Sequence, residues 1–246
     1  MVVFRIWGKF ASFREPLTIS QNISLPIPPK TTVAGMIASI LGVEDYLQDE
    51  GFFDFGYSVV ALSSIRKKSF SQNYINDYTT KTQTQLNNMR KNDFEKIAQG
   101  LRDKKNPQKP INRELLLNPD FLIFVKDFKN EMKLKNHLQE KKSIFPFYLG
   151  NSEFLGNFEN IEVESYQVRT VEKGYINSFV LQKDTQNIEF CEGVRYGKLT
   201  FATKLNDKRS PQSYKSVVFA DESLLVDNLE VIEIQTDQKR YYCQFV

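Results

Sequence analysis

Three polar residues, Lys30, Thr31 and Thr32, stand where a proline-rich loop (residues 26–29) gives way to an apolar pattern of helical spacing. The first turn of a helix has unpaired N–H groups and the positive end of the helix dipole, so it favours an anion. A lysine and two hydroxyls would add a charge and hydrogen bonds for a phosphate. The alternative is an ordinary helix, capped by a threonine and packed on a sheet. The Gly-x-x-x-x-Gly-Lys spacing of a nucleotide-triphosphate loop is absent.

Two shorter polar segments could act beside this helix. In the first, Arg14 could reach a phosphate and Phe13 could stack on a base, with Ser12 next to them. In the second, Asn151 and Ser152 lie in a glycine-initiated turn and could meet RNA or a neighbouring subunit. The alternatives are a core phenylalanine, a surface arginine and a tight turn whose polar side chains satisfy local backbone groups.

The segment from Arg66 to Arg113 is strongly basic. It holds twelve Lys/Arg and four Asp/Glu, whereas the rest of the chain holds 21 basic and 26 acidic residues, so a net charge of +3 conceals a local +8. Cations bind a nucleic-acid backbone through its phosphates, and interleaved aromatic rings stack on unpaired bases. A solvated charged face is the alternative. The candidate RNA contacts are Arg66, Lys67, Lys68, Tyr74, Tyr78, Lys81 and Arg90.

Signals for catalysis or metal binding are poor. His137 is the only histidine and lies in a lysine-rich predicted helix, while Cys191 and Cys243 are far apart. These residues form no metal-ligand cluster and no nucleophile–base pattern. We therefore expect no catalytic residue, no metal, no cofactor and no small-molecule substrate.

The elements that must position these residues follow a recognisable order. Strands are predicted over 2–10, 57–65, 120–126 and 160–169, and helices over 30–41, ended by Gly42, and over 129–142. Residues 69–88 are predicted to be an extended hairpin or loop, followed by a helix over 94–101 with a capping box at 92–95. Strands are further predicted over 175–182, 196–203 and 215–220, with a hairpin pairing 230–235 with 240–246.

This order predicts an α+β protein. It matches the β-α-β-β-α-β order of a ferredoxin-like (RRM-like) domain over residues 1–169, with the basic arm of about 66–113 inserted between its second and third strands. Residues 170–246 are predicted to form a β-rich C-terminal part packed on that domain.

The chain of 246 residues is long enough to bury a sizeable core. Its mean hydropathy is −0.43, and we find neither a membrane span nor a signal peptide. We expect a cytoplasmic protein with free thiols.

Two blocks of sequence resemble a known family. The first runs from Phe4 to Pro16 and from Leu25 to Gly42, including Pro-Pro-Lys-Thr-Thr-Val-Ala-Gly-Met at 28–36, and the second is Tyr-Leu-Gly-Asn-Ser-Glu-Phe at 148–154. Together they look like the CRISPR-associated Cas proteins of family five, and the first block is similar to members from I-B-like systems.

The resemblance implies an RNA-recognition-like fold with a projecting thumb, here the basic arm. It also implies one copy in a type I Cascade complex, where the family holds the 5′ handle of the CRISPR RNA (crRNA). Such a subunit contacts the backbone subunit and the large subunit, and meets target DNA only through the complex.

Three hypotheses remain open. The leading one is a non-catalytic subunit that caps the 5′ handle in defence against foreign DNA. The second is a metal-independent endoribonuclease that processes precursor RNA, as one branch of the family does with a Tyr/Lys/His set. Here Asn136 separates Lys135 from His137, and nothing in the sequence brings Tyr46 near them. The third is a protein-only scaffold whose basic arm binds an acidic partner.

Overall fold

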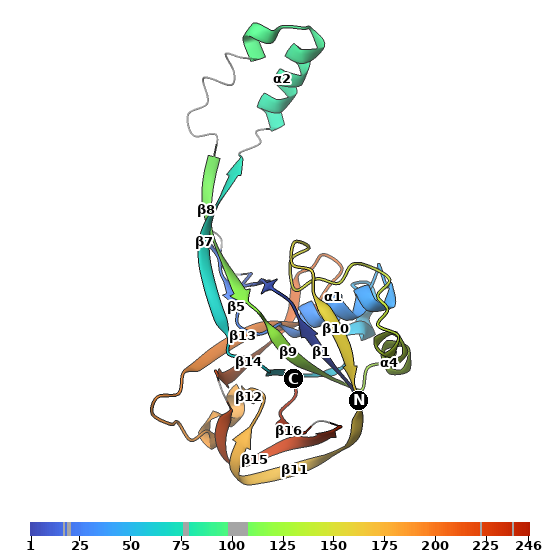
Figure 1. Cartoon of the computed structure of the whole chain (residues 1–246), viewed down its shortest axis with the longest axis vertical. Coiled ribbons are helices and arrows are strands. Elements are labelled where there is room, and N and C mark those ends of the chain that lie inside the picture. Colours follow the sequence, from blue (N-terminus) through green and yellow to red (C-terminus); the bar gives the residue numbers. More distant parts are fainter. Residues whose placement is uncertain (17, 19–20, 76–78, 98–107, 222, 238) are drawn as a thin grey trace. The chain divides into compact units, whose positions relative to one another are not determined.

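The computed structural model (Figure 1) describes residues 1–16, 18, 21–75, 79–97, 108–221, 223–237 and 239–246. The chain forms two compact units: Met1–Glu15, Ser24–Lys68 and Leu115–Val246 make the first, and Pro16–Ile23 and Ser69–Glu114 make the second. The predicted arm largely coincides with the second unit, which also takes in residues 16–23. The predicted boundary at 169/170 falls inside strand β11 (Val163–Ile176), and the residues on both sides of it lie in the first unit.

The first unit is built on a four-stranded sheet in the order β10-β1-β9-β6, in which every neighbouring pair is antiparallel. Helix α1 follows the first of these strands, and helix α4 connects the third to the fourth. The bounds are β1 (Val2–Trp7), α1 (Lys30–Leu41), β6 (Gly56–Ala61), β9 (Asp120–Lys126), α4 (Glu131–Gln139) and β10 (Asn157–Ile161).

Both faces of this sheet are buried, because successive side chains of a strand point to opposite sides. Phe4 and Ile123 belong to a core shared with α1 and α4. Val3 and Phe124 belong to a second core, which they share with Ile234 of strand β15 (Leu224–Thr236). The flat faces of the sheet are therefore covered by protein and offer no open surface for a ligand.

Helix α1 confirms the predicted element, but its cap differs from the prediction. Pro29 is the N-cap, and its carbonyl oxygen accepts hydrogen bonds from the N–H groups of Thr32 (2.9 Å) and Val33 (3.1 Å). The predicted threonine cap is wrong, because both threonines lie inside the first helical turn. Gly42 ends the helix as predicted, at a φ of 72° that favours glycine.

The C-terminal part contributes two further sheets, in the orders β11-β15-β16 and β12-β14-β13. The predicted terminal hairpin is confirmed, with Ile232 opposite Cys243. The predicted strand 160–169 is two strands, β10 and β11, and the predicted strand 175–182 is the end of β11 and the separate β12. The remaining bounds are β12 (Val180–Leu181), η2 (Gln182–Asn187), β13 (Tyr196–Leu205), β14 (Pro211–Ala220) and β16 (Arg240–Cys243).

Short elements complete the first unit. Strand β3 (Phe13–Arg14) pairs with β5 (Ser24–Leu25), and β2 (Phe10–Ala11) pairs with the end of β8. A 3-10 helix, η1 (Glu50–Phe53), precedes β6. No helix among the described residues is long and apolar enough to cross a membrane.

The second unit contains parts of two paired strands, β7 (Arg66–Ile75) and β8 (Gln108–Leu117), with β4 (Gln21–Asn22) parallel to β8. The prediction of an extended segment over 69–88 holds for the strand but is wrong for helix α2 (Thr79–Arg90). The following helical turn is described over 94–97, and the rest of the predicted helix lies outside the described residues. Its cap is Asp93, whose Oδ1 accepts from the Lys96 N–H (3.3 Å), and not the predicted Asn92.

Candidate nucleic-acid interface

The two sequence blocks meet in space. The Ser12 N–H donates to the carbonyl oxygen of Leu149 (3.1 Å). Gly150 has a φ of 92°, and a Cβ atom at this position would lie 1.9 Å from the carbonyl oxygen of Ser12. A glycine is therefore required here both by its backbone conformation and by the space available. Segments more than a hundred residues apart in sequence are thus held together by a buried backbone contact.

Next to this contact, a groove of about 210 Å³ runs along α1. Residues of the helix form one wall, and the segment 148–150, the end of β13 and the loop after it supply further lining residues. Tyrosine rings can stack on a base, while hydroxyls and a guanidinium can bind phosphate oxygens. The polar and aromatic lining residues are Thr31, Thr32, Ser39, Tyr46, Tyr148 and Arg209.

Arg209 is held in place by the tight loop after β13. The Asn206 Oδ1 accepts from the N–H groups of Lys208 (3.1 Å) and Ser210 (2.8 Å), and the Arg209 N–H donates to the Asn206 carbonyl (2.9 Å). Burial raises the pKa of Tyr46, and the nearby positive charge of Arg209 acts in the opposite direction. The guanidinium and the phenol are therefore electrostatic neighbours at the groove.

Tyr46 lies against α1 beside Gly35, at a distance that would also accommodate a small side chain. A Cβ atom on Gly35 would lie 3.4 Å from the Tyr46 Oη. The Tyr46 ring also packs at 5.4 Å from Phe52 and at 6.0 Å from Phe53, measured between ring centroids. The phenol is thus fixed by the core on one side while it lines the groove on the other.

Lys30 does not line the groove. It is 8% exposed, and its Nζ lies 4.8 Å from the centroid of the Phe55 ring. Burial lowers the pKa of Lys30 to about 8, partly offset by the negative charge of Asp54. The prediction of an open phosphate ligand is wrong for this lysine, because its ammonium packs against an aromatic ring. Thr31 and Thr32 do line the groove, as the hypothesis of an anion site requires.

The segment Ser12–Arg14 divides between the core and the surface. Phe13 is 1% exposed and lies 6.2 Å from Phe121, so the prediction that it stacks on a base is wrong. Ser12 is also buried and acts through its backbone contact with Leu149. Arg14 is exposed, as a phosphate contact would need.

The second block forms the predicted turn. The Leu149 N–H donates to the Phe154 carbonyl (2.7 Å), and the Phe154 N–H donates to the Asn151 carbonyl (3.0 Å). Asn151 is half-buried and Ser152 is exposed at the turn, but neither lines the groove. The residues of this segment that line the groove are Tyr148 and Gly150.

The cations of the predicted arm lie in both units. Arg66, Lys67 and Lys68 are exposed in the first unit, where the Lys67 Nζ donates to the Ser24 carbonyl (2.6 Å). Arg90 is exposed at the end of α2 in the second unit. Tyr78 lies outside the described residues, and for Tyr74 and Lys81 the description covers the backbone of β7 and α2 only.

Four of the six polar or aromatic groove residues were not predicted from the sequence: Ser39, Tyr46, Tyr148 and Arg209. Arg209 stands in a run, Asn-Asp-Lys-Arg-Ser at 206–210, that resembles any polar turn. The sequence suggests Tyr46 only as a partner for His137 in catalysis. A further signal was available: residues 196–220 hold five basic residues and one acidic residue, a second local excess of positive charge.

His137 does not belong to the groove. It lies on α4, half-buried, and its Nδ1 has no hydrogen-bond partner among the described residues. Nor does the described part of the chain contain a group of His, Cys, Asp or Glu side chains that could hold a metal ion.

The first unit is thus a mixed α/β scaffold with a polar, aromatic and cationic groove. The family described as CRISPR-associated protein (Cas_Cas5) matches residues 1–210, and the chain belongs to this family. No curated protein matches the chain.

One solved structure supports the fold, and two others are less similar. A chain of a "CRISPR RNA-guided surveillance complex" is similar with a TM-score of 0.53 at 11% identity, covering 92% of this chain and 90% of the other. A CRISPR protein from Archaeoglobus fulgidus has a TM-score of 0.47 at 11% identity, covering 99% and 100%. A chain of a type III-B Cmr-beta complex has a TM-score of 0.48 at 12% identity, covering 91% and 86%. Of these three, only the surveillance-complex chain has a TM-score above 0.5, and at 11% identity it supports a similarity of fold and nothing more.

Proposed function

We propose that this chain is a non-catalytic, RNA-binding subunit of a type I Cascade complex that caps the 5′ handle of the crRNA. The observation that carries the proposal is the groove, which two threonines, two tyrosines and Arg209 line together. These groups suit a short, unpaired RNA segment, since they can bind phosphates and stack on bases without reading a duplex. Membership of the Cas_Cas5 family supports the same assignment.

We infer that the elements β1, α1, β6, β9, α4 and β10 form a ferredoxin-like unit. The strand order β10-β1-β9-β6, with antiparallel neighbours and a helix in each crossover, supports this assignment. With its sheet covered on both faces, such a unit would bind RNA beside α1 and not on the sheet.

In the proposed role the chain contacts a backbone subunit and a large subunit in the cytoplasm, and it serves defence against foreign DNA. The similarity of the first block to members from I-B-like systems favours that subtype. The proposal leaves precursor cleavage to another protein, because the groove contains no histidine.

The test is binding of the purified chain to the handle RNA of its own CRISPR locus, followed by fluorescence anisotropy. Replacing both hydroxyls, Thr31→Val with Thr32→Val, should weaken binding about tenfold, the effect of losing one or two hydrogen bonds. Arg209→Asn should do the same, and asparagine tolerates the positive φ of 59° at this position. Lys183→Asn is the matched control, because Lys183 is exposed and does not line the groove.

Two results would contradict the proposal. The first is an affinity for handle RNA that equals the affinity for unrelated RNA and is unchanged in the groove variants. The second is efficient, EDTA-resistant cleavage of repeat RNA that is lost in His137→Ala, which would favour the endoribonuclease.

A further inference from the structure

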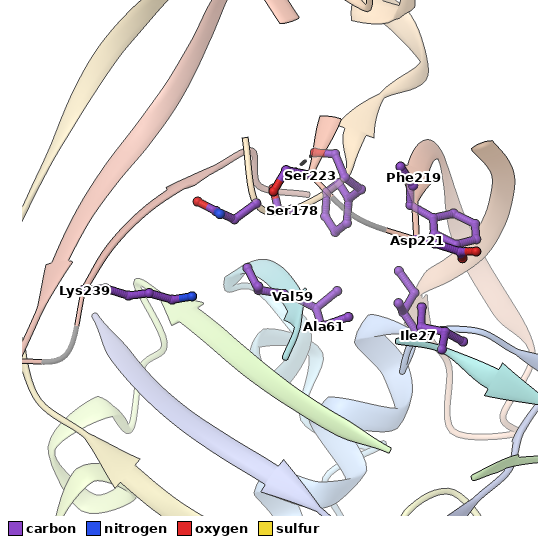
Figure 2. A pocket seen from close by; sticks show the side chains of 13 residues that line it. Ile27, Val59, Ala61, Ser178, Phe219, Asp221, Ser223 and Lys239 are labelled. Atoms are coloured by element: carbon purple, nitrogen blue, oxygen red, sulfur yellow. Dashed lines mark hydrogen bonds between the residues drawn. The ribbon is translucent and has the colours of Figure 1, made fainter. Parts of the chain in front are cut away.

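Strands β6 and β11 both lie at the edge of a sheet in the first unit, but they differ in their access to solvent. Val59 and Val60 of β6 are only 3% and 5% exposed. Figure 2 shows Val59 at a cavity of about 190 Å³, with Phe219 on the other side of it. The edge of β6 is therefore enclosed by the chain itself and is closed to a partner.

Strand β11 is open both along its outer edge and on its faces. It is the outermost strand in the order β11-β15-β16, and its 14 residues pair with β15 alone (Figure 1). The residues from 164 to 170 are all exposed, among them Val168 at 66% and Tyr166 at 45%. Another chain can therefore reach this strand without any movement of the fold.

The outer edge of β11 has backbone groups to offer. Alternate residues of an antiparallel edge strand direct their N–H and C=O groups away from the neighbouring strand. Among the residues that the structure describes, only those of β15 hydrogen-bond to the backbone of residues 164–175. Residues 165–170 also lack proline, lysine and a register shift, which are devices that usually block such an edge. The edge can thus pair with a further strand.

One face of the strand carries a surplus of positive charge. The Glu233 carboxylate of β15 accepts from the Arg169 guanidinium (3.0 Å), from that of Arg240 (2.9 Å) and from the Gln167 amide (3.3 Å). The hydrogen bonds from Arg169 and Gln167 and the charge of Arg240 lower the pKa of Glu233, so the carboxylate is ionised. One negative charge therefore meets two positive charges, and both arginine side chains are about half exposed (53% and 52%).

The opposite face of the same strand is apolar where it is exposed. Successive side chains alternate between the two faces, so Tyr166 and Val168 lie on the face away from Arg169. Their cross-strand neighbours on β15 are Ile234 and Ile232, which pack in the second core beneath the four-stranded sheet. Tyr166 and Val168 thus continue the apolar surface of that core out to the open edge.

We propose that the outer edge of β11 binds an extended segment of a partner protein, which becomes a fourth strand of the sheet β11-β15-β16. The segment would place an acidic side chain opposite Arg169 on one face. On its other face it would place apolar side chains opposite Val168 and Tyr166. This inference goes beyond the proposed RNA-binding function, because none of these residues lines the groove on α1.

The charges along β11 favour a peptide with one acid over RNA. Arg169 is the only basic residue between positions 164 and 172, whereas Glu164 and Glu172 are both exposed. A phosphate backbone that runs along the strand would be repelled by these two carboxylates. A peptide strand can bring a single carboxylate to Arg169 and carry no other negative charge.

A second copy of this chain fits the edge less well. In an antiparallel pairing about a twofold axis, Arg169 of one copy meets only residues of its own face in the other copy. No acid stands on this face between positions 165 and 173, where its residues are Ser165, Gln167, Arg169, Val171 and Lys173. The surplus positive charge would stay unpaired, so the observations favour a different chain.

The test uses the whole chain and a labelled, end-blocked peptide, Lys-Thr-Thr-Glu-Val-Thr-Val-Thr-Lys, whose glutamate would lie opposite Arg169 in an antiparallel strand. The reversed sequence, Lys-Thr-Val-Thr-Val-Glu-Thr-Thr-Lys, serves for a parallel strand. Fluorescence anisotropy should show binding of one of the two peptides. Replacing the glutamate of that peptide by glutamine should weaken binding about fivefold, the effect of one exposed ion pair.

Backbone pairing is tested on the peptide that binds, with one N-methyl group placed either on its glutamate or on the adjacent valine. Alternate N–H groups of an added strand point to its neighbour, so only one of these two positions faces β11. Methylation there should weaken binding about tenfold, because one ladder donor is lost. Methylation at the other position is the matched control, and the comparison does not depend on the folding of a protein variant.

Two protein variants test the two faces of the strand. Arg169→Gln should weaken binding of the glutamate peptide about fivefold and leave binding of the glutamine peptide unchanged. Lys198→Gln is the matched control, because it removes an exposed positive charge from β13. Val168→Lys should weaken binding of both peptides about fivefold, because it removes the apolar contact and places a lysine on the edge.

The proposal is overturned if neither peptide binds the folded chain, or if both N-methylated peptides bind as tightly as the unmodified one. Displacement of the bound peptide by a short RNA of unrelated sequence would assign the edge to RNA and overturn it as well. So would a dimer in sedimentation velocity that Val168→Lys dissociates, since the occupant would then be a second copy. Handle-RNA binding is measured on other residues, so either proposal can fail while the other stands.

Discussion

The carbonyl oxygen of Ser12 occupies the place that a side chain on Gly150 would need: a Cβ atom there would lie 1.9 Å away. This relationship ties the turn of the second block to the segment after β1, and Tyr148, beside that glycine, lines the groove on α1. The position of one groove wall thus depends on a backbone contact and not on a side chain.

Gly150→Ala should lower the free energy of unfolding by roughly 3 kcal/mol. The substitution strains a backbone with a φ of 92° and also forces the backbone of Ser12 away. Urea denaturation, followed by circular dichroism, measures the change. Gly193→Ala is the matched control, because Gly193 has a similar φ of 82° but nothing lies within 4 Å of the added Cβ. The control should lose only about 1 kcal/mol, and equal losses would argue against the clash.

Tyr57→Phe should destabilise the chain by about 1–2 kcal/mol. Tyr57 is fully buried, and its hydroxyl donates to the Pro28 carbonyl in the loop that leads into α1. The phenylalanine would leave that carbonyl without its partner in a place that water does not reach. Thermal or urea unfolding measures the loss. Tyr175→Phe, at a residue that is 62% exposed, should be nearly neutral, and similar losses in the two variants would contradict a role for the hydrogen bond.

The sequence predicts best where local pattern and tertiary burial agree. Helix α1 and strand β9 were both predicted to within a residue of their ends. The apolar spacing of the helix and the continuous apolar run of the strand are side chains that the structure buries. Helix α2 was missed because Thr and Asn have weak helix propensities and because residues 83–90, whose burial the structure describes, are all exposed or half-buried and make no apolar pattern.

The groove shows what a local pattern cannot supply. Thr31 and Thr32 were found because a helix start is a local feature. Arg209 was not, because it reaches the groove only through the packing of β13 against α1. For the same reason, no pattern indicates that Phe13 and Lys30 turn toward the core: their burial depends on Phe121 and Phe55, which lie elsewhere in the sequence.

The stability contribution of Lys30 should depend on pH. Burial lowers the pKa of its ammonium to about 8 from the ordinary 10.5. Between these two values the unfolded chain binds more protons than the folded chain, so the free energy of unfolding rises with pH across this window. The wild type should therefore gain about 2 kcal/mol relative to Lys30→Met between pH 8 and pH 10. Urea denaturation of both proteins at the two pH values measures this gain, and Lys183→Met, at an exposed lysine, should show no such change. A constant difference between wild type and Lys30→Met would mean that the ammonium is not desolvated.

Arg209→Asn should change the salt dependence of handle-RNA binding as well as its affinity. Each cation that neutralises a phosphate of single-stranded RNA releases counterions, so the logarithm of the binding constant falls with the logarithm of salt concentration by about 0.7 per contact. Removing the guanidinium should therefore make this slope shallower by about 0.7, while the Thr31→Val, Thr32→Val double variant should leave the slope unchanged because it removes no charge. Anisotropy titrations over a range of KCl concentrations measure both slopes, with Lys183→Asn as the variant that loses an exposed charge outside the groove. If Arg209→Asn and Lys183→Asn alter the slope equally, the chain attracts RNA through its general positive charge, and the groove is not where the phosphate is held.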